Sequence, residues 1–182
     1  MKYIISESQH KRLFEEEQKV LHIPDIRIFG DDWDNLQRFL ESKGNPLYSL
    51  GGNLDLVGLK VESLGNLVSV EHDLYAYDTP LKSLGSLTSV GGNLDLDGTP
   101  VESLRNLTSV DGNLDLSHSS IESLGNLTSV GGNLNLLYTE IESFENLISV
   151  GRTLYIIKTP LAEKYSEKEI RQLVNVGKNI LS

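Results

Sequence analysis

Cysteine is absent from the 182 residues, and methionine and tryptophan occur once each. The lack of cysteine excludes disulfide scaffolds, zinc ribbons, iron–sulfur sites and cysteine nucleophiles. Long apolar runs are also missing. No stretch approaches the roughly 18 apolar residues that a membrane-spanning helix needs, and the first residues hold no apolar run of signal-peptide length. We therefore expect a cytoplasmic protein that folds as one globular domain or two small ones.

Basic residues are the second shortage. The chain has 16 Lys and Arg against 26 Asp and Glu, which gives a formal net charge of −10. The imbalance lies in the middle, because residues 50–165 hold 15 acidic and 6 basic residues while both flanks are close to neutral. Phosphate backbones are bound through Lys and Arg, so this charge argues against nucleic acid and anionic membranes as direct ligands.

The acidic middle repeats with a period of 20 residues, and its clearest unit is VGGNLDLDGTPVESLRNLTS at residues 90–109. Within the unit, N-L-D-L-D alternates polar and apolar residues. This alternation predicts a short strand with Leu94 and Leu96 facing inward and Asn93, Asp95 and Asp97 facing outward. One unit cannot bury its own leucines, so we expect successive units to stack into a parallel ladder.

The apolar and threonine positions of the unit resemble those of the leucine-rich repeat family, since residues 94–101 follow the pattern L-x-L-x-x-T-x-V. The resemblance covers residues 47–163 and implies an α/β solenoid of about six parallel-strand coils that binds other proteins through its strand face. A Gly-Gly pair replaces the first family leucine, as in β-helical receptor L domains. The short period favours extended or 3₁₀ segments on the return path. The opening KYIISESQ resembles the start of small proteins of marine viruses and phages.

Both flanks of the repeats are predicted to be caps, because an open apolar coil needs a cover. For the N-terminal cap, residues 1–46, we expect four elements: a strand at residues 3–5, a helix from 6 to about 21, an extended piece at 24–29 and a helix at 33–43 that Gly44 closes. The helix at 33–43 should begin at Asp31 or Asp32.

The repeat region is assigned to residues 47–164, with Lys164 replacing the apolar residue that would continue it. For residues 165–182 we predict a C-terminal capping helix. Ser166 and Glu169 form its capping box. Its apolar face comprises Ile170, Leu173, Val174, Gly177 and Ile180 or Leu181.

Catalytic and metal-binding residues are not indicated. The four histidines lie at unrelated positions, and the abundant serines recur with the repeat. Asp95, Asp97 and Gly98 imitate the start of an EF-hand loop, but position twelve would be Asn106 in place of Glu. We therefore expect no catalytic site, no metal and no cofactor.

The outward strand face carries three columns of mostly polar or aromatic residues, which hold five Asp and no Lys or Arg. The Asn column, from Asn53 to Asn133, is explained by an amide ladder. The Asp column is harder to explain by stability, because like charges on neighbouring strands repel each other. The aromatic and apolar departures from the repeat suit anchors for a partner, or packing under a terminal segment or in a homodimer. The predicted partner-binding residues are Asp55, Asp73, Tyr75, Tyr77, Asp95, Asp97, Asp115, Leu137, Tyr138, Tyr155 and Ile157.

Three functions remain open at this point. The first is a non-enzymatic interaction module that binds a basic protein surface through the acidic strand face and rim. The second is an acidic nucleic-acid mimic that inhibits a DNA- or RNA-acting host defence enzyme. The third is an enzyme whose site lies in the N-terminal region, where no constellation of residues supports it.

Overall fold

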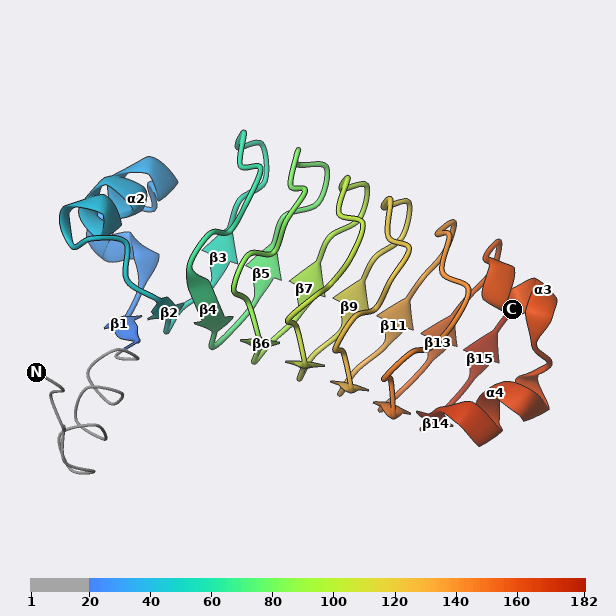
Figure 1. Ribbon diagram of the computed structural model, residues 1–182. Helices are drawn as coiled ribbons and strands as arrows, with labels where there is room; N and C mark the ends of the chain where they lie inside the picture. The colour runs from blue at the N-terminus through green and yellow to red at the C-terminus, as the bar shows by residue number, and fades with distance from the viewer. Residues whose placement is uncertain (1–19) are drawn as a thin grey trace, which may run out of the picture.

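The computed structural model describes residues 20–182 and shows a parallel β-solenoid of about 5 stacked coils with a spacing of about 20 residues (Figure 1). Each coil contributes a short strand to each of two parallel sheets, which run side by side along the solenoid. The predicted parallel stacking is confirmed, since residues 20 apart are paired in register, as Asp95 is with Asp115.

The first sheet, here called the Ser–Val sheet, has eight strands in spatial order. They are β1 (Leu21–Ile23), β2 (Tyr48–Leu50), β4 (Leu67–Val70), β6 (Ser89–Val90), β8 (Ser109–Val110), β10 (Ser129–Val130), β12 (Ser149–Val150) and β14 (Asn175–Val176). The sequence predicted only a return path here, so this sheet is an addition to the prediction.

The second sheet, here called the Leu–Asp sheet, holds the predicted strands. Its seven members, in spatial order from the N-terminal end, are β3 (Leu54–Asp55), β5 (Leu74–Tyr75), β7 (Leu94–Asp95), β9 (Leu114–Asp115), β11 (Leu134–Asn135), β13 (Leu154–Tyr155) and β15 (Ile180–Leu181). The predicted inward leucines are buried, with Leu96 and Leu116 at 0% exposure, while Asp95 and Asp115 point outward and remain partly exposed. The alternation therefore assigns the two faces correctly.

Glycine and threonine fit the coils together at two recurrent positions. A Cβ atom on Gly112 would lie 2.6 Å from the carbonyl oxygen of Gly92, so the Gly-Gly corner permits a close approach that a side chain would block. A buried threonine or serine holds this position in five coils (Thr79, Thr99, Ser119, Thr139 and Thr159), and Thr99 Oγ1 donates to the Leu96 carbonyl at 2.8 Å. This bond satisfies a buried hydroxyl within its own coil.

The N-terminal end agrees with the prediction in part. The helix α2 (Trp33–Ser42) is capped by Asp32, whose side chain accepts from the Asn35 N–H. It buries Trp33, Leu36 and Leu40 at one end of the solenoid (Figure 1). The predicted extended piece at 24–29 is wrong, because it contains the 3₁₀ helix η1 (Ile26–Phe29) capped by Asp25. The predicted strand at 3–5 and most of the helix at 6–21 lie outside the described residues, but Leu21 belongs to strand β1.

The C-terminal end corrects the prediction of one long helix. Residues 160–173 form α3 (Pro160–Lys164) and α4 (Glu167–Leu173), and the predicted capping box of Ser166 and Glu169 is present in α4. The chain then returns to the solenoid, because β14 pairs with β12 and β15 pairs with β13. Val176 and Ile180 are buried as core residues of these strands and do not lie on a helical face. The sheets therefore continue past Lys164.

None of the helices between residues 20 and 182 combines the length and the apolar composition required to cross a bilayer.

Candidate functional site

The outer face of the Leu–Asp sheet gathers the predicted acidic residues, and we call Asp73, Asp95, Asp97 and Asp115 the acidic face. These residues lie on or next to three consecutive strands, β5, β7 and β9, in register. All four are partly exposed. Asp55 lies one coil further toward the N-terminal end and is more exposed.

The Asn column forms the predicted ladder, although its bonds join side chain to backbone. Asn93 Oδ1 accepts from the Asn113 N–H at 2.9 Å, and Asn113 Oδ1 accepts from the Asn133 N–H at 2.8 Å. Asp73 takes the same role, because its Oδ1 accepts from the Asn93 N–H at 2.6 Å. Each side chain thereby supplies an acceptor to the next coil, and the column stabilises the stack.

The Asp column also has a structural role, which corrects the expectation that stability does not explain it. Asp95 Oδ1 accepts from the Asp97 N–H at 3.1 Å, and Asp115 Oδ1 accepts from the Ser117 N–H at 2.9 Å. Asn135 makes the same bond to the Leu137 N–H at 3.2 Å. A side-chain oxygen that accepts from the backbone two residues later is an Asx turn, which ends the strand. Either Asp or Asn satisfies the turn, so the negative charge is not required by it.

The ionisation of the acidic face differs from one carboxyl group to the next. The Asn93 N–H and the Tyr75 hydroxyl donate to Asp73, at 2.6 and 3.0 Å, and lower the pKa of Asp73. The bond to Asp73 in turn raises the pKa of Tyr75. Burial raises the pKa of Asp95, and the nearby carboxylates of Asp115 and Asp97 add to that rise. Hydrogen bonding thus favours the charge on Asp73, while burial and, to a smaller extent, the neighbouring carboxylates disfavour it on Asp95.

A polar network joins the acidic face to the turns beside it. The Ser117 hydroxyl lies between Asp97 and Asp115 and hydrogen-bonds to both. His118 Nδ1 lies 3.0 Å from Asp97 Oδ1, and the His118 ring stacks on Tyr138 with ring centroids 4.9 Å apart. No Lys or Arg in the described part of the chain forms a salt bridge with these carboxylates.

The predicted aromatic and apolar anchors lie in two groups on either side of the acidic face. Tyr75 and Tyr77 belong to the coil of β5, and Tyr77 is 39% exposed. The second group, on the coils of β11 and β13, consists of Leu137, Tyr138, Tyr155 and Ile157. Tyr138 is 55% exposed and has a left-handed backbone with φ of 58°, which is uncommon for an aromatic residue.

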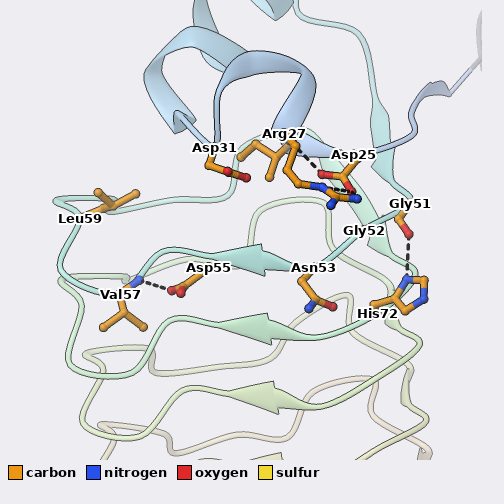
Figure 2. A pocket seen from close by; sticks show the side chains of 11 residues that line it. Asp25, Arg27, Asp31, Gly51, Gly52, Asn53, Asp55, Val57, Leu59 and His72 are labelled. Carbon is orange, nitrogen blue, oxygen red and sulfur yellow. Dashed lines mark hydrogen bonds and ion pairs between the residues drawn. The ribbon is translucent and has the colours of Figure 1, made fainter.

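A cleft of about 870 Å³ lies beyond the acidic face at the N-terminal end, between η1 and β3 (Figure 2). Asp31 and Arg27 lie on one side of it, and Asn53 and Asp55 lie on the other. Arg27 pairs with Asp25 at 2.6 Å, and this contact lowers the pKa of Asp25. The repeat pattern does not predict this cleft, because Asp25, Arg27 and Asp31 lie outside the repeat.

The cleft offers polar groups but no metal site. His72 Nδ1 lies 2.8 Å from the Gly51 carbonyl oxygen at its edge. In the part of the chain that the structure describes, no group of three or more His, Asp or Glu side chains is arranged to hold a metal ion.

Comparisons with protein-family models, with curated proteins and with solved structures each find no match to this chain. The function must therefore be argued from the acidic face, the anchors and the cleft.

Proposed function

We propose that this chain is a non-enzymatic protein-interaction module whose acidic face binds a basic surface on another protein. The observation that supports the proposal most is the crowding of Asp95, Asp97 and Asp115, of which Asp97 contacts the ring of His118 at 3.0 Å. The fold does not need this charge, because Asn135 makes the same turn without it. A partner that brings Lys or Arg to the face would relieve the repulsion between the carboxylates.

The carboxylates are also preorganised for binding. Asp95 and Asp115 are each held by a hydrogen bond to the backbone two residues later. A partner therefore loses little free energy in ordering them. Exposed aromatic groups such as Tyr77 and Tyr138 flank the acidic face and suit the anchoring role that aromatic side chains play in interfaces.

The size of the face limits how the partner binds. Strands about 4.8 Å apart and outward residues about 6.6 Å apart give a face on the order of 300 Å². A standard interface takes about 800 Å² from each partner. The partner therefore also contacts the glycine-rich rim or the N-terminal end, unless a homodimer presents two copies of the face.

A nucleic-acid mimic that inhibits a DNA- or RNA-acting defence enzyme is the second candidate, and the same row of carboxylates favours it. The two candidates differ in the partner: a mimic binds the nucleic-acid site of an enzyme, so DNA or RNA competes with it. An interaction module that binds another basic surface is not displaced by nucleic acid.

The assignment to leucine-rich repeats, with about six coils and terminal caps, belongs to the same proposal. It is supported by the buried Leu and Thr columns and by α2 and α4 at opposite ends of the solenoid. A cytoplasmic location and a viral or phage origin are further parts of it.

The experiment is affinity capture from a cell lysate with three immobilised forms of the chain. The test variant is Asp95→Asn/Asp97→Asn/Asp115→Asn, which keeps hydrogen-bond acceptors at all three positions. The control replaces three exposed glutamates outside the acidic face, Glu102, Glu122 and Glu142, by Gln, so it removes the same charge. Basic proteins retained by the wild type and the control but lost from the test variant support the proposal. Equal retention by all three forms contradicts it.

A further inference from the structure

The two sheets end differently at the N-terminal end of the solenoid. Among residues 20–182, the Ser–Val sheet continues beyond β2 to β1, whereas the Leu–Asp sheet ends at β3. One strand is therefore missing beside β3, at the place where the cleft lies (Figure 2).

The sequence after β1 explains the missing strand. Ile23 pairs with Leu50, so a regular coil would place Arg27 at the inward position that Leu54 holds in the next coil. Leu54 is 0% exposed, and a charged guanidinium is not tolerated at such a position without a partner. Instead, the Asp25 side chain accepts from the Arg27 N–H at 2.8 Å, and the chain turns into η1 away from β3.

The backbone of β3 presents to the cleft hydrogen-bonding groups that residues 20–182 leave unused. The N–H groups of Leu54 and Leu56 donate to Asp73 and Tyr75 of the next coil, both at 2.8 Å. Because backbone groups alternate in direction along a strand, the peptide groups of Asn53 and Asp55 point toward the cleft. No residue of η1 or α2 bonds to them. An exposed sheet edge of this kind is a template for another strand.

The side chains around the cleft select the charge of a ligand. Arg27 is engaged by Asp25, and the two remaining carboxylates that line the cleft are Asp31 on the side of η1 and Asp55 on β3, whose Oδ1 also accepts from the Val57 N–H at 3.0 Å (Figure 2). The volume of about 870 Å³ is within the range of ligand-binding clefts and suits a short extended segment. Lys or Arg side chains on that segment would reach these two carboxylates.

We propose that the cleft takes an extended, basic peptide segment of a protein partner, which adds to the Leu–Asp sheet as a strand parallel to β3. Its backbone bonds to the peptide groups of Asn53 and Asp55, and its basic side chains pair with Asp31 and Asp55. This is the β-augmentation mode of peptide recognition. It uses residues outside the acidic face and stands independently of the function proposed above.

The probe for the test is the blocked peptide acetyl-Val-Lys-Val-Lys-Val-amide, titrated into the full chain and followed by NMR. We expect the Asp55 amide to shift and its hydrogen exchange to slow. Two further probes carry backbone N-methyl groups, one on the three valines and one on the two lysines. Strand addition uses the N–H groups of alternate residues, so one methylated probe should bind about tenfold more weakly than the other.

The test variant is Asp31→Asn/Asp55→Asn. Asn suits the left-handed backbone of Asp31, which has φ of 57°, and it preserves the turn at Asp55 as Asn135 does in its own coil. We expect this variant to bind the lysine probe about fivefold more weakly at low salt. The matched control, Asp95→Asn/Asp115→Asn, changes the acidic face alone and should bind the probe as the wild type does.

Several results would overturn the proposal. Equal affinity of both methylated probes would mean that charge alone holds the peptide. Unchanged affinity in Asp31→Asn/Asp55→Asn, or the absence of any shift at Asp55, would place binding elsewhere. Tighter binding after removal of residues 1–19 would show that the chain's own segment is the occupant of the cleft. Loss of binding in the control would assign the peptide to the acidic face.

Discussion

Replacing Asn113 tests whether the Asn column holds the coils together. Asn113 Oδ1 accepts from the Asn133 N–H at 2.8 Å, and Asn133 is half-buried. Asn113→Ala leaves that N–H without its acceptor, which costs about 1–3 kcal/mol for a buried group and about 1–2 kcal/mol here, where water reaches part of the site. For a chain of this size the melting temperature should fall by roughly 2–8 °C.

The matched control is Asn113→Asp, because Asp73 makes the same bond to the next coil at 2.6 Å. The control keeps the acceptor, so it should lose clearly less stability than Asn113→Ala at pH 7. The first assay is urea unfolding, in which the free energies of unfolding are compared between forms whose dependence on urea concentration is the same. The second is hydrogen exchange of the Asn133 amide, which reports the bond directly even if the solenoid unfolds in parts. An Ala variant as stable as the wild type, or an Asp variant as unstable as the Ala variant, would refute the ladder.

Three further predictions follow from burial, charge and the C-terminal end. Leu114→Ala should lower the free energy of unfolding in urea by about 2–5 kcal/mol, because Leu114 is 1% exposed, and a loss below about 1 kcal/mol would contradict its place in the core. Asp95→Asn should stabilise the fold at pH 7 by about 0.2–1 kcal/mol, since a raised pKa means that ionised Asp95 disfavours the folded state. Measured by urea unfolding, that gain in stability should vanish as the pH falls through the pKa of Asp95. A gain that persists at low pH would contradict the claim that the charge of Asp95 destabilises the fold. Arg171→Ala should speed hydrogen exchange in β14 and β15, because Arg171 donates to the carbonyls of Val176 and Lys178 at 3.0 and 2.7 Å. Unchanged exchange would show that these bonds do not stabilise the C-terminal strands.

The repeat could be predicted from the sequence because one pattern decides several levels of structure at once. Leu94 and Leu96 alternate with outward polar residues, and their 20-residue recurrence fixes both the face and the register. The Ser–Val sheet could not be predicted in the same way. From β6 onward its strands, such as Ser89–Val90, are two residues long and hold no alternation that separates a strand from a turn.

The two ends of the solenoid were predicted only in part, because strand pairing between distant residues overrides the local sequence pattern there. Ile180 pairs with Leu154, 26 residues earlier, so the inserted α3 and α4 break the 20-residue period and hide the last coil. At the other end, Arg27 occupies a position that the repeat reserves for a buried leucine, and the chain leaves the sheet. The cleft follows from that departure, which becomes visible only when the pairing of Ile23 with Leu50 is known.

The Asp column shows why a surface pattern can have two explanations. From the sequence, Asp95 and Asp115 on neighbouring strands indicated function, because like charges repel. Their bonds to the backbone of Asp97 and Ser117 give each a structural role that only the geometry reveals. The binding hypothesis therefore depends on the charge alone, and Asn substitutions separate the two roles.

The most direct test of the acidic face is the affinity of a captured basic partner, measured by titration calorimetry with the wild type and with Asp95→Asn/Asp97→Asn/Asp115→Asn. At about 0.15 M salt, exposed charges are screened beyond roughly 8 Å, so a difference reports contacts made at the face. We predict an affinity at least about tenfold lower for the variant, with a melting temperature no lower than that of the wild type. Equal affinities of the two forms would contradict the proposal that this face binds the partner.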